Sequence, residues 1–362
     1  MARNVKDYER RVFKVLEESI KEAENRDRII HKERDVFLDE DNYSFIEKMK
    51  WVKLPNIEKV AIVNYQDDWF VCSLNNKRYS GELVKETESW CGDALTVALI
   101  SSHRMPIASN TTEIQIVDSV LAVEEDKYQV KELKELFSPQ TSYLLSDSFD
   151  ISYQEDLIRL ICLLEIDEKK YLTEKTRGFL VELLFLESSR SVAQLIVNIC
   201  HTHDSKLIFL QLYRMMEYLF MIHKAIEMGK KYDIDKKVIV EMLCDDHAFR
   251  QAEEQHVVEL ISGYASTDSK DKYIDYLKNN NLTSEQVENC DEALAKYIYK
   301  RRCQIAHFKY RQEEIPDEAV LSESNERLAE LVKTMYIKLN NDIVTVNDHF
   351  ETWSEVCYES IE

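Results

Sequence analysis

Glycine and proline are scarce in this chain, with five glycines and four prolines among 362 residues. Because glycine supplies the backbone conformations of phosphate-binding loops and tight turns, this scarcity disfavours Rossmann turns and β-sandwiches and favours long helices. The sequence also contains no motif of a P-loop NTPase, a serine hydrolase or a zincin. These three classes of enzyme are therefore excluded.

The chain also has few basic residues relative to acidic ones and no long apolar run. Lys and Arg total 47 against 68 Asp and Glu, a formal net charge of −21, so any contact with nucleic acid needs a local basic cluster. No apolar run has the length of a membrane span, and the charged start MARNVKDYERR lacks the apolar segment of a signal peptide. Eight cysteines without a C-x-x-C pair are typical of a reducing compartment. We therefore expect a cytoplasmic protein with no membrane contact.

The first 145 residues mix helical and strand patterns. Apolar residues at helical spacing predict one charged amphipathic helix over residues 4–36, and 81–102 is also expected to be helical. Short segments rich in β-branched and aromatic residues predict strands at 57–63, 68–74 and 113–123. This part of the chain is therefore expected to be an α+β module.

From about residue 150 the strand pattern stops and helical periodicity takes over. Asp204 precedes one expected helix, and Thr283 with Gln286 forms a capping-box pattern before another. The segment 207–226 is apolar nearly all round, which predicts the buried centre of a bundle, whereas the amphipathic 322–346 predicts a peripheral helix. Helices are expected at roughly 153–172, 174–200, 205–229, 235–248, 250–264, 269–279, 284–310 and 322–346.

The predicted fold is therefore mainly α, with an amino-terminal α+β module followed by a helical bundle. We expect the module at 1–145 to sense a trigger or hold a regulatory protein partner. Connecting helices are expected at 146–204, and the bundle at 205–362.

One segment runs against the overall charge. The run LAKYIYKRRCQIAHFKYR (294–311) carries six Lys and Arg residues, no carboxylate and four interleaved aromatic residues. Such a helix is suited to a phosphate backbone with stackable bases, although a basic face that pairs with acidic helices of the same protein is an equal alternative. The candidate RNA-binding residues are Lys296, Lys300, Arg301 and Lys309.

This basic segment contains an Arg followed five positions later by a His, Arg302 and His307. Together with YRMMEYLF (213–220), it resembles the HEPN superfamily (higher eukaryotes and prokaryotes nucleotide-binding domains) over about residues 200–350. These are helical bundles, many of them metal-independent ribonucleases of toxin and antiviral systems. The family pattern Tyr-x-x-Arg-Asn-x-apolar-apolar-His is matched by Tyr299, Arg302, Ile305, Ala306 and His307.

The resemblance implies an endoribonuclease that needs no metal and no cofactor. The RNA 2′-hydroxyl attacks the adjacent phosphate, His307 transfers a proton, and the cationic Arg302 balances charge on the phosphorane. Two other spacings of this kind, Arg26 with His31 and Arg250 with His256, lack the surrounding basic segment and are interpreted as coincidence.

Two differences from the family pattern keep an alternative open. Cys303 stands where active members carry Asn, Asp or His, and Tyr310 follows the His by three residues rather than two. The alternative is a non-catalytic, dimerising regulatory protein that binds a nucleotide or a protein partner. The candidate orienting residues are Glu217, Cys303 and Tyr310. Glu217 is expected either to orient Arg302 or to pair locally with Arg214.

The spacing within the pair also poses a geometric problem. Five residues span about 500° of an α-helix, so Arg302 and His307 point roughly 140° apart. Either the helix bends before the histidine, or two copies of the chain contribute to one site. The resemblance favours a homodimer, because HEPN nucleases commonly form a composite cleft.

A second cluster of polar residues was considered for metal binding. The segment CHTHD (200–204) brings together Cys200, His201 and His203, but it lacks a second ligand pair at a convincing spacing. We interpret it as a helix end and a short link, with Asp204 as the cap of the next helix. No metal site is therefore expected.

Overall fold

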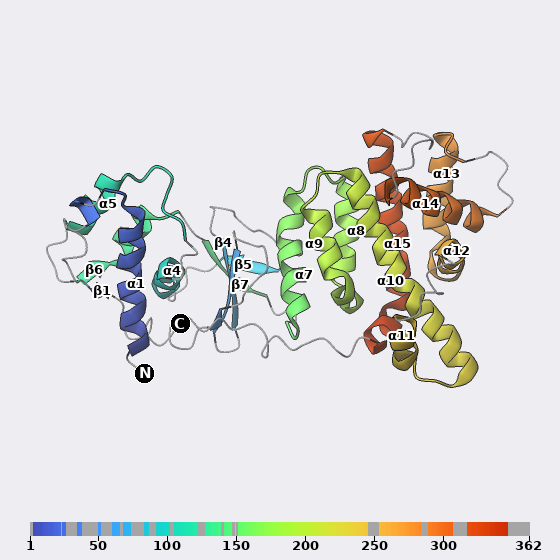
Figure 1. Cartoon of the computed structure of the whole chain (residues 1–362), viewed down its shortest axis with the longest axis horizontal. Coiled ribbons are helices and arrows are strands. Elements are labelled where there is room, and N and C mark those ends of the chain that lie inside the picture. The colour runs from blue at the N-terminus through green and yellow to red at the C-terminus, as the bar shows by residue number, and fades with distance from the viewer. Residues whose placement is uncertain are drawn as a thin grey trace. The chain divides into compact units, whose positions relative to one another are not determined.

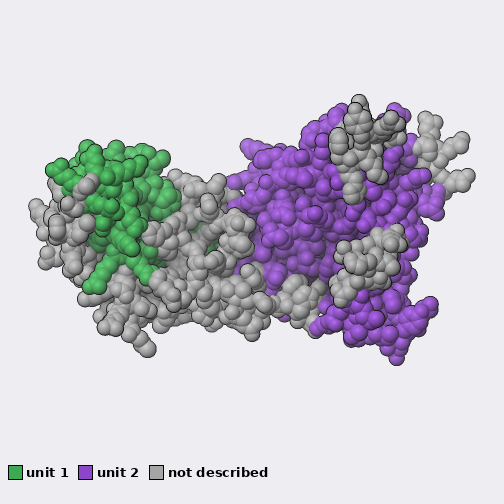
Figure 2. Space-filling view, viewed as in Figure 1, with its two compact units in different colours: residues 1–152, 352–362 green, residues 153–351 purple. Residues whose placement is uncertain are grey.

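The computed structural model divides into two compact units, Met1–Ser152 with Thr352–Glu362, and Tyr153–Glu351 (Figure 2). In the described part of the chain, strands occur only in the first unit and most residues are helical, which confirms the mainly α fold class with an α+β region (Figure 1). The structure describes residues 3–22, 24–26, 35–37, 50–51, 60–65, 68–73, 83–86, 92–101, 105–121, 127–138, 141–146, 149, 151–244, 253–283, 289–306 and 317–346.

The first unit combines a small antiparallel sheet with helices. Within the described residues the strand order is β2-β3-β4-β7-β5, and β1 pairs separately with β6 in parallel. β3 and β4 confirm the strands expected at 57–63 and 68–74 as far as these segments are described. The elements are α1 (Arg3–Ser19), β1 (Asp35–Phe37), β2 (Lys50–Trp51), β3 (Val60–Tyr65), β4 (Asp68–Ser73), β5 (Val84–Glu86), α4 (Gly92–Ser101), α5 (Glu113–Leu121), β6 (Lys127–Gln129), α6 (Val130–Leu136) and β7 (Thr141–Leu145).

The expectation of a single helix over residues 4–36 is wrong, because α1 ends at Ser19, although residues 24–26 are again helical. Val12, Leu16 and Ile20 recur every four residues and are fully or almost fully buried against the core, and α1 packs on α4. A tight turn closes the helix after Ser19, where the backbone N–H of Ile20 donates to the Glu17 carbonyl at 3.1 Å. Residues 35–37 form β1 instead.

The strand expected at 113–123 is also wrong, because Glu113–Leu121 forms α5. Thr112 and Gln115 make a capping box: the Gln115 N–H donates to the Thr112 hydroxyl at 3.3 Å, and the Thr112 N–H donates to the Gln115 side chain at 2.8 Å. The capping signal and the helical spacing of the buried Ile116 and Val120 outweigh the β-propensity of this segment.

The helix expected at 81–102 is correct only in its second part. Val84–Glu86 is the edge strand β5, which pairs with β7, and the helix α4 occupies Gly92–Ser101. Asp93 near its start suits the positive end of the helix dipole, and the run from Ala94 to Ile100 is completely buried.

The second unit is a bundle of helices, with no strand in its described part. Their order follows the sequence prediction, except that the one helix expected at 174–200 is divided into α8 and α9 by a 3₁₀ turn. The helices α7 to α9 belong to the same compact unit as the later ones. The helices are α7 (Gln154–Glu165), α8 (Glu174–Leu184), α9 (Ala193–Cys200), α10 (Ser205–Tyr232), α11 (Lys236–Cys244), α12 (Glu253–Tyr264), α13 (Thr267–Asn279), α14 (Cys290–Ala306) and α15 (Glu318–Val346), with 3₁₀ turns at Ile166–Glu168 and Glu187–Val192.

The helix α10 is the buried centre of this bundle, as its apolar sequence predicts. It contacts α9, α11, α12, α14 and α15. Its start is fixed by Asp204, whose side chain accepts the Lys206 N–H at 2.8 Å, so the predicted cap is confirmed. Its end is marked by Asp233, which adopts the left-handed conformation. α10 therefore positions residues from several neighbours around itself.

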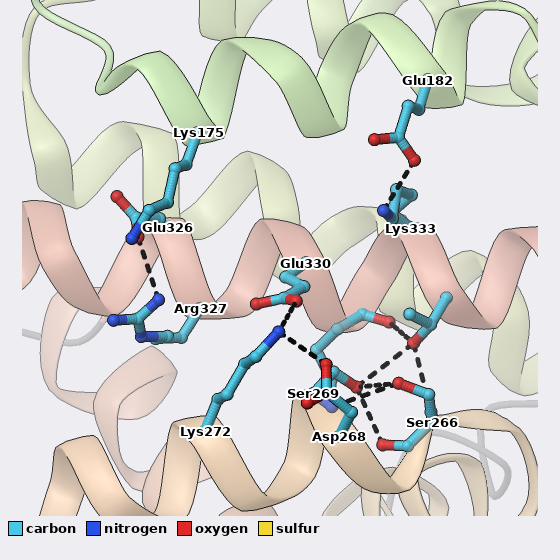
Figure 3. A network of polar contacts seen from close by, with 12 residues as sticks. Lys175, Glu182, Ser266, Asp268, Ser269, Lys272, Glu326, Arg327, Glu330 and Lys333 are labelled. Atoms are coloured by element: carbon cyan, nitrogen blue, oxygen red, sulfur yellow. Dashed lines mark hydrogen bonds and ion pairs between the residues drawn. The ribbon is translucent and has the colours of Figure 1, made fainter.

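The helix α15 is central rather than peripheral, which corrects the prediction for 322–346. It packs against α8, α10 and α13. Its position is hidden in the sequence because the acidic Glu326 and Glu330 look like surface residues. Figure 3 shows that these side chains are held between helices: Lys175 of α8 donates to Glu326 at 3.1 Å, and Lys272 of α13 donates to Glu330 at 2.9 Å. Paired carboxylates can be buried at such a junction.

Candidate functional site

Arg302 lies on α14, which packs against α10, α12 and α13. The first turn of α14 is fixed by Asn289, whose side-chain oxygen accepts the N–H of Asp291 at 3.0 Å. The capping box expected at Thr283 depends on Gln286, which lies outside the described residues. Asn289 therefore sets the start of the helix that carries the candidate site.

The guanidinium of Arg302 is held by carboxylates from two other helices. Its Nη2 lies 3.4 Å from Glu217 Oε1 on α10 and 3.5 Å from Glu253 Oε1 on α12. It also lies 5.6 Å from the centre of the Tyr213 ring, which is cation–π distance. Of the two partners considered for Glu217, the structure places Arg302 in contact, while Arg214 acts on it only through a weaker charge effect.

Burial governs the electrostatics of this cluster. Burial raises the pKa of Glu217 above its ordinary value, the Glu253 charge adds to this, and the Arg302 charge opposes it. Burial alone would lower the pKa of Arg302, but the carboxylates of Glu253 and Glu217 outweigh it and raise that pKa. Burial also raises the pKa of Tyr213, whose hydroxyl is without a hydrogen-bond partner. Arg302 thus stays a cation, and its Nη2 lies within ion-pair distance of both carboxylates.

The basic residues on α14 divide between its two faces. Lys296 and Lys300 are exposed, as their predicted role in RNA binding requires. Arg301, in contrast, is only 7% exposed, and its guanidinium lies 5.3 Å from the centre of the Tyr297 ring. It follows the buried Leu294 by two helical turns, so the phase of the helix directs it inward. This position does not support the predicted contact of Arg301 with RNA.

Cys303 is half-buried and interacts with Tyr299, one helical turn earlier. A hydrogen bond between the two side chains is the main cause that raises the pKa of Tyr299, with burial second. The sulfur therefore occupies the place of the family's Asn and contacts a tyrosine of the same helix. The helix α14 is described as far as Ala306. Three predicted site residues lie outside the described residues: His307, Lys309 and Tyr310.

The CHTHD segment forms the link that its sequence predicts. Its His203 ring lies 4.1 Å from the ring of Tyr171, and both residues line a shallow pocket with Cys200. The Tyr171 hydroxyl donates to the Cys200 carbonyl, which ends α9. Where the structure is described, these histidines are not part of any group of three potential metal ligands.

Sequence reasoning missed a different cluster, on α10 and α12. His223 and Glu227 are four residues apart on α10, and His256 and Glu259 are three residues apart on α12. Both spacings place a His and a Glu on the same face of their helix, and this was a readable signal. What it did not reveal is that the two faces meet: His223, Glu227 and Glu259 bring ligand atoms within 4.8 Å of one another.

No family model matches the sequence, and comparison with curated proteins and with solved structures found no significant match. Among the helices that the structure describes, none combines the length and hydropathy that crossing a membrane requires. Fold and site together therefore define a mainly helical protein with an amino-terminal α+β unit and an Arg–carboxylate cluster in its helical unit.

Proposed function

We propose that the helical unit is a metal-independent endoribonuclease in which Arg302 and His307 are the catalytic residues. The observation that carries this proposal is the setting of Arg302, whose guanidinium is fixed between carboxylates of α10 and α12. A cation held in advance stabilises a developing charge at no cost of reorganisation. The basic, aromatic-rich sequence around Arg302 and His307 also supports the proposal.

The proposed reaction is an internal transesterification of RNA. A base removes the proton of the 2′-hydroxyl, whose oxygen attacks the adjacent phosphorus, and an acid protonates the leaving 5′-oxygen. The ordinary pKa of a histidine side chain lies near neutrality, so histidine can act as the base or as the acid. His307 carries out one of these two proton transfers. Arg302 binds the phosphate oxygens. The products are a 2′,3′-cyclic phosphate and a 5′-hydroxyl.

Glu217 and Glu253 are positioning residues in this proposal. Together they bring two negative charges to one guanidinium, so the substrate phosphate has to compete with them for Arg302. The exposed Lys296 and Lys300 on the same helix supply the attraction that brings RNA close. We further propose that the enzyme acts as a homodimer in antiviral defence or as a toxin, with the amino-terminal unit as sensor or partner-binding module.

The test is cleavage of labelled RNA in excess EDTA by the wild type, Arg302→Ala and His307→Ala. Each substitution is expected to lower the cleavage rate about 100-fold or more. Lys206→Ala and His201→Ala, which remove exposed basic groups elsewhere in the same unit, are expected to leave it unchanged. Cleavage that survives His307→Ala, or that disappears in EDTA for the wild type, contradicts the proposal.

One observation favours a second candidate, a non-catalytic binding protein. The charge of Arg302 is already balanced by two carboxylates, and Cys303 contacts Tyr299 where the family carries a polar residue. Such a site suits dimer contact or nucleotide binding without chemistry. Wild type that leaves RNA intact, yet shows a thermal shift with a nucleotide that Arg302→Ala abolishes, would identify this function.

A further inference from the structure

One ring nitrogen of His223 faces two carboxylates, and both lie slightly beyond hydrogen-bond distance. Its Nε2 lies 3.6 Å from Glu227 Oε1 on the same helix and 3.6 Å from Glu259 Oε2 on α12. The residue is only 8% exposed, and this nitrogen is without a hydrogen-bond partner. A buried polar atom without a protein partner has room for a water molecule or an ion as its partner.

The other ring nitrogen of His223 is held in the way that metal-ligating histidines are held. Its Nδ1 lies 3.1 Å from the Tyr264 hydroxyl on α12, and the two rings meet edge to face. When Nδ1 carries the proton and donates it to this hydroxyl, the lone pair of Nε2 points at the two carboxylates. A cation between these three electron-rich atoms would stabilise them, and Glu259 Oε2 is also contacted by Lys224 Nζ at 2.9 Å and by His256 Nδ1 at 3.4 Å.

We propose that His223, Glu227 and Glu259 bind one divalent transition-metal ion that links α10 to α12. In a tetrahedral zinc site with bonds of about 2.1 Å, neighbouring ligand atoms are about 3.4 Å apart. The separations of 3.6 Å on both sides of His223 Nε2 match that edge closely. A mixed imidazole and carboxylate set selects zinc or another late first-row ion over magnesium or calcium, and a water molecule completes the coordination.

The ammonium group of Lys224 lies beside this site, and its removal provides a test of the proposal. The ammonium of Lys224 is 2.7 Å from Glu227 Oε2 and 2.9 Å from Glu259 Oε2. It competes with a metal ion for the same carboxylates. An ion network explains these two contacts but leaves the buried Nε2 of His223 without a partner, and a bound metal ion would supply that partner.

This site is separate from the proposed catalysis. It lies on the two helices that contact Arg302, about two to three turns beyond Glu217 and Glu253, but no step of the RNA reaction uses it. A metal here fixes α10 against α12. Zinc is therefore expected to raise thermal stability whether or not the protein cleaves RNA. Because EDTA removes such an ion, the cleavage assay in EDTA counts only for protein that circular dichroism shows to be folded in EDTA.

The test is titration of the chelator-treated full chain with Zn²⁺, measured calorimetrically. The wild type is expected to bind about one ion per chain. Glu227→Gln, at a half-exposed position that tolerates substitution, and His223→Gln are both expected to weaken binding more than tenfold. His203→Ala, which removes a histidine of the other cluster, is the matched control and is expected to bind like the wild type.

Lys224→Gln separates the metal site from an ion network. Removing the competing ammonium is expected to strengthen Zn²⁺ binding several-fold and to give a variant that zinc stabilises against heat more than the wild type. Circular dichroism confirms that each variant is folded before it is titrated. Failure of the folded wild type to bind Zn²⁺, or equal binding by Glu227→Gln, overturns the proposal.

Discussion

Glu217 shows how strongly one residue depends on its surroundings. It lies among the apolar residues at the centre of α10, and burial raises its pKa. The sequence reveals that such a carboxylate needs a partner, because an unpaired buried charge is costly. It does not reveal Glu253, which reaches Arg302 from a helix 49 residues earlier in the chain. The local pattern therefore predicted one of the two carboxylates at this guanidinium.

The raised pKa of Glu217 predicts how stability changes with pH. The folded protein holds this proton more tightly than the unfolded chain, so the contribution of Glu217 to stability is most favourable below the ordinary pKa of 4.5. It declines as the pH rises through the raised pKa. The unfolding free energy of Glu217→Gln relative to the wild type is therefore expected to increase from about pH 4 to about pH 8.

Denaturant unfolding of both proteins across this pH range measures that difference. Glu174→Gln is the control, because Glu174 is an exposed residue in the first turn of α8. A difference between wild type and Glu217→Gln that is constant with pH, or that falls as pH rises, contradicts the electrostatic account of the Arg302 cluster.

Among the elements, helices were easier to predict than strands. From Tyr153 onward, 3.6-residue periodicity placed the described helical segments close to their observed positions, because a helix that buries one face carries that face in its sequence. The errors had physical causes. α5 is rich in β-branched residues but begins with a capping box, and α15 buries paired carboxylates that mark a surface helix elsewhere. Tertiary packing and capping overrode the local preference in these two helices.

The contribution of the α10 cap to stability can be predicted. The Asp204 side chain accepts the N–H of Lys206, and α10 is the helix around which the second unit packs. Asp204→Ala is expected to lower the free energy of unfolding by about 1 kcal/mol. Asp204→Asn, which keeps an acceptor oxygen, is expected to lower it by less. Chemical unfolding monitored by circular dichroism measures both, and equal effects would show that the cap does not act as described.

For the whole molecule, the charge distribution predicts how RNA binding depends on salt. The chain carries a net charge of −21, while α14 exposes Lys296 and Lys300. Binding through these lysines is expected to weaken steeply with salt. Replacing both by Ala is expected to lower the logarithmic salt slope by about 0.7 for each phosphate that is no longer neutralised. Lys230 and Lys231, at the end of α10, provide a matched control pair. An unchanged slope places the RNA elsewhere.

The composite-site hypothesis predicts complementation between two inactive proteins. If Arg302 of one copy and His307 of another form one site, then mixing Arg302→Ala with His307→Ala produces heterodimers with one intact site. Random exchange of subunits is expected to restore about a quarter of the wild-type rate. An inactive mixture in which light scattering and tagged subunits confirm exchange means that each chain supplies its own Arg and His.

The proposed cleavage of RNA without a metal ion leaves a chemical signature at the cut ends. RNA incubated with the wild type in excess EDTA is expected to yield fragments with 2′,3′-cyclic phosphate and 5′-hydroxyl ends, and the same preparation of His307→Ala is expected to yield none. Intact RNA with both proteins, or fragments that carry 5′-phosphate ends, would contradict the account.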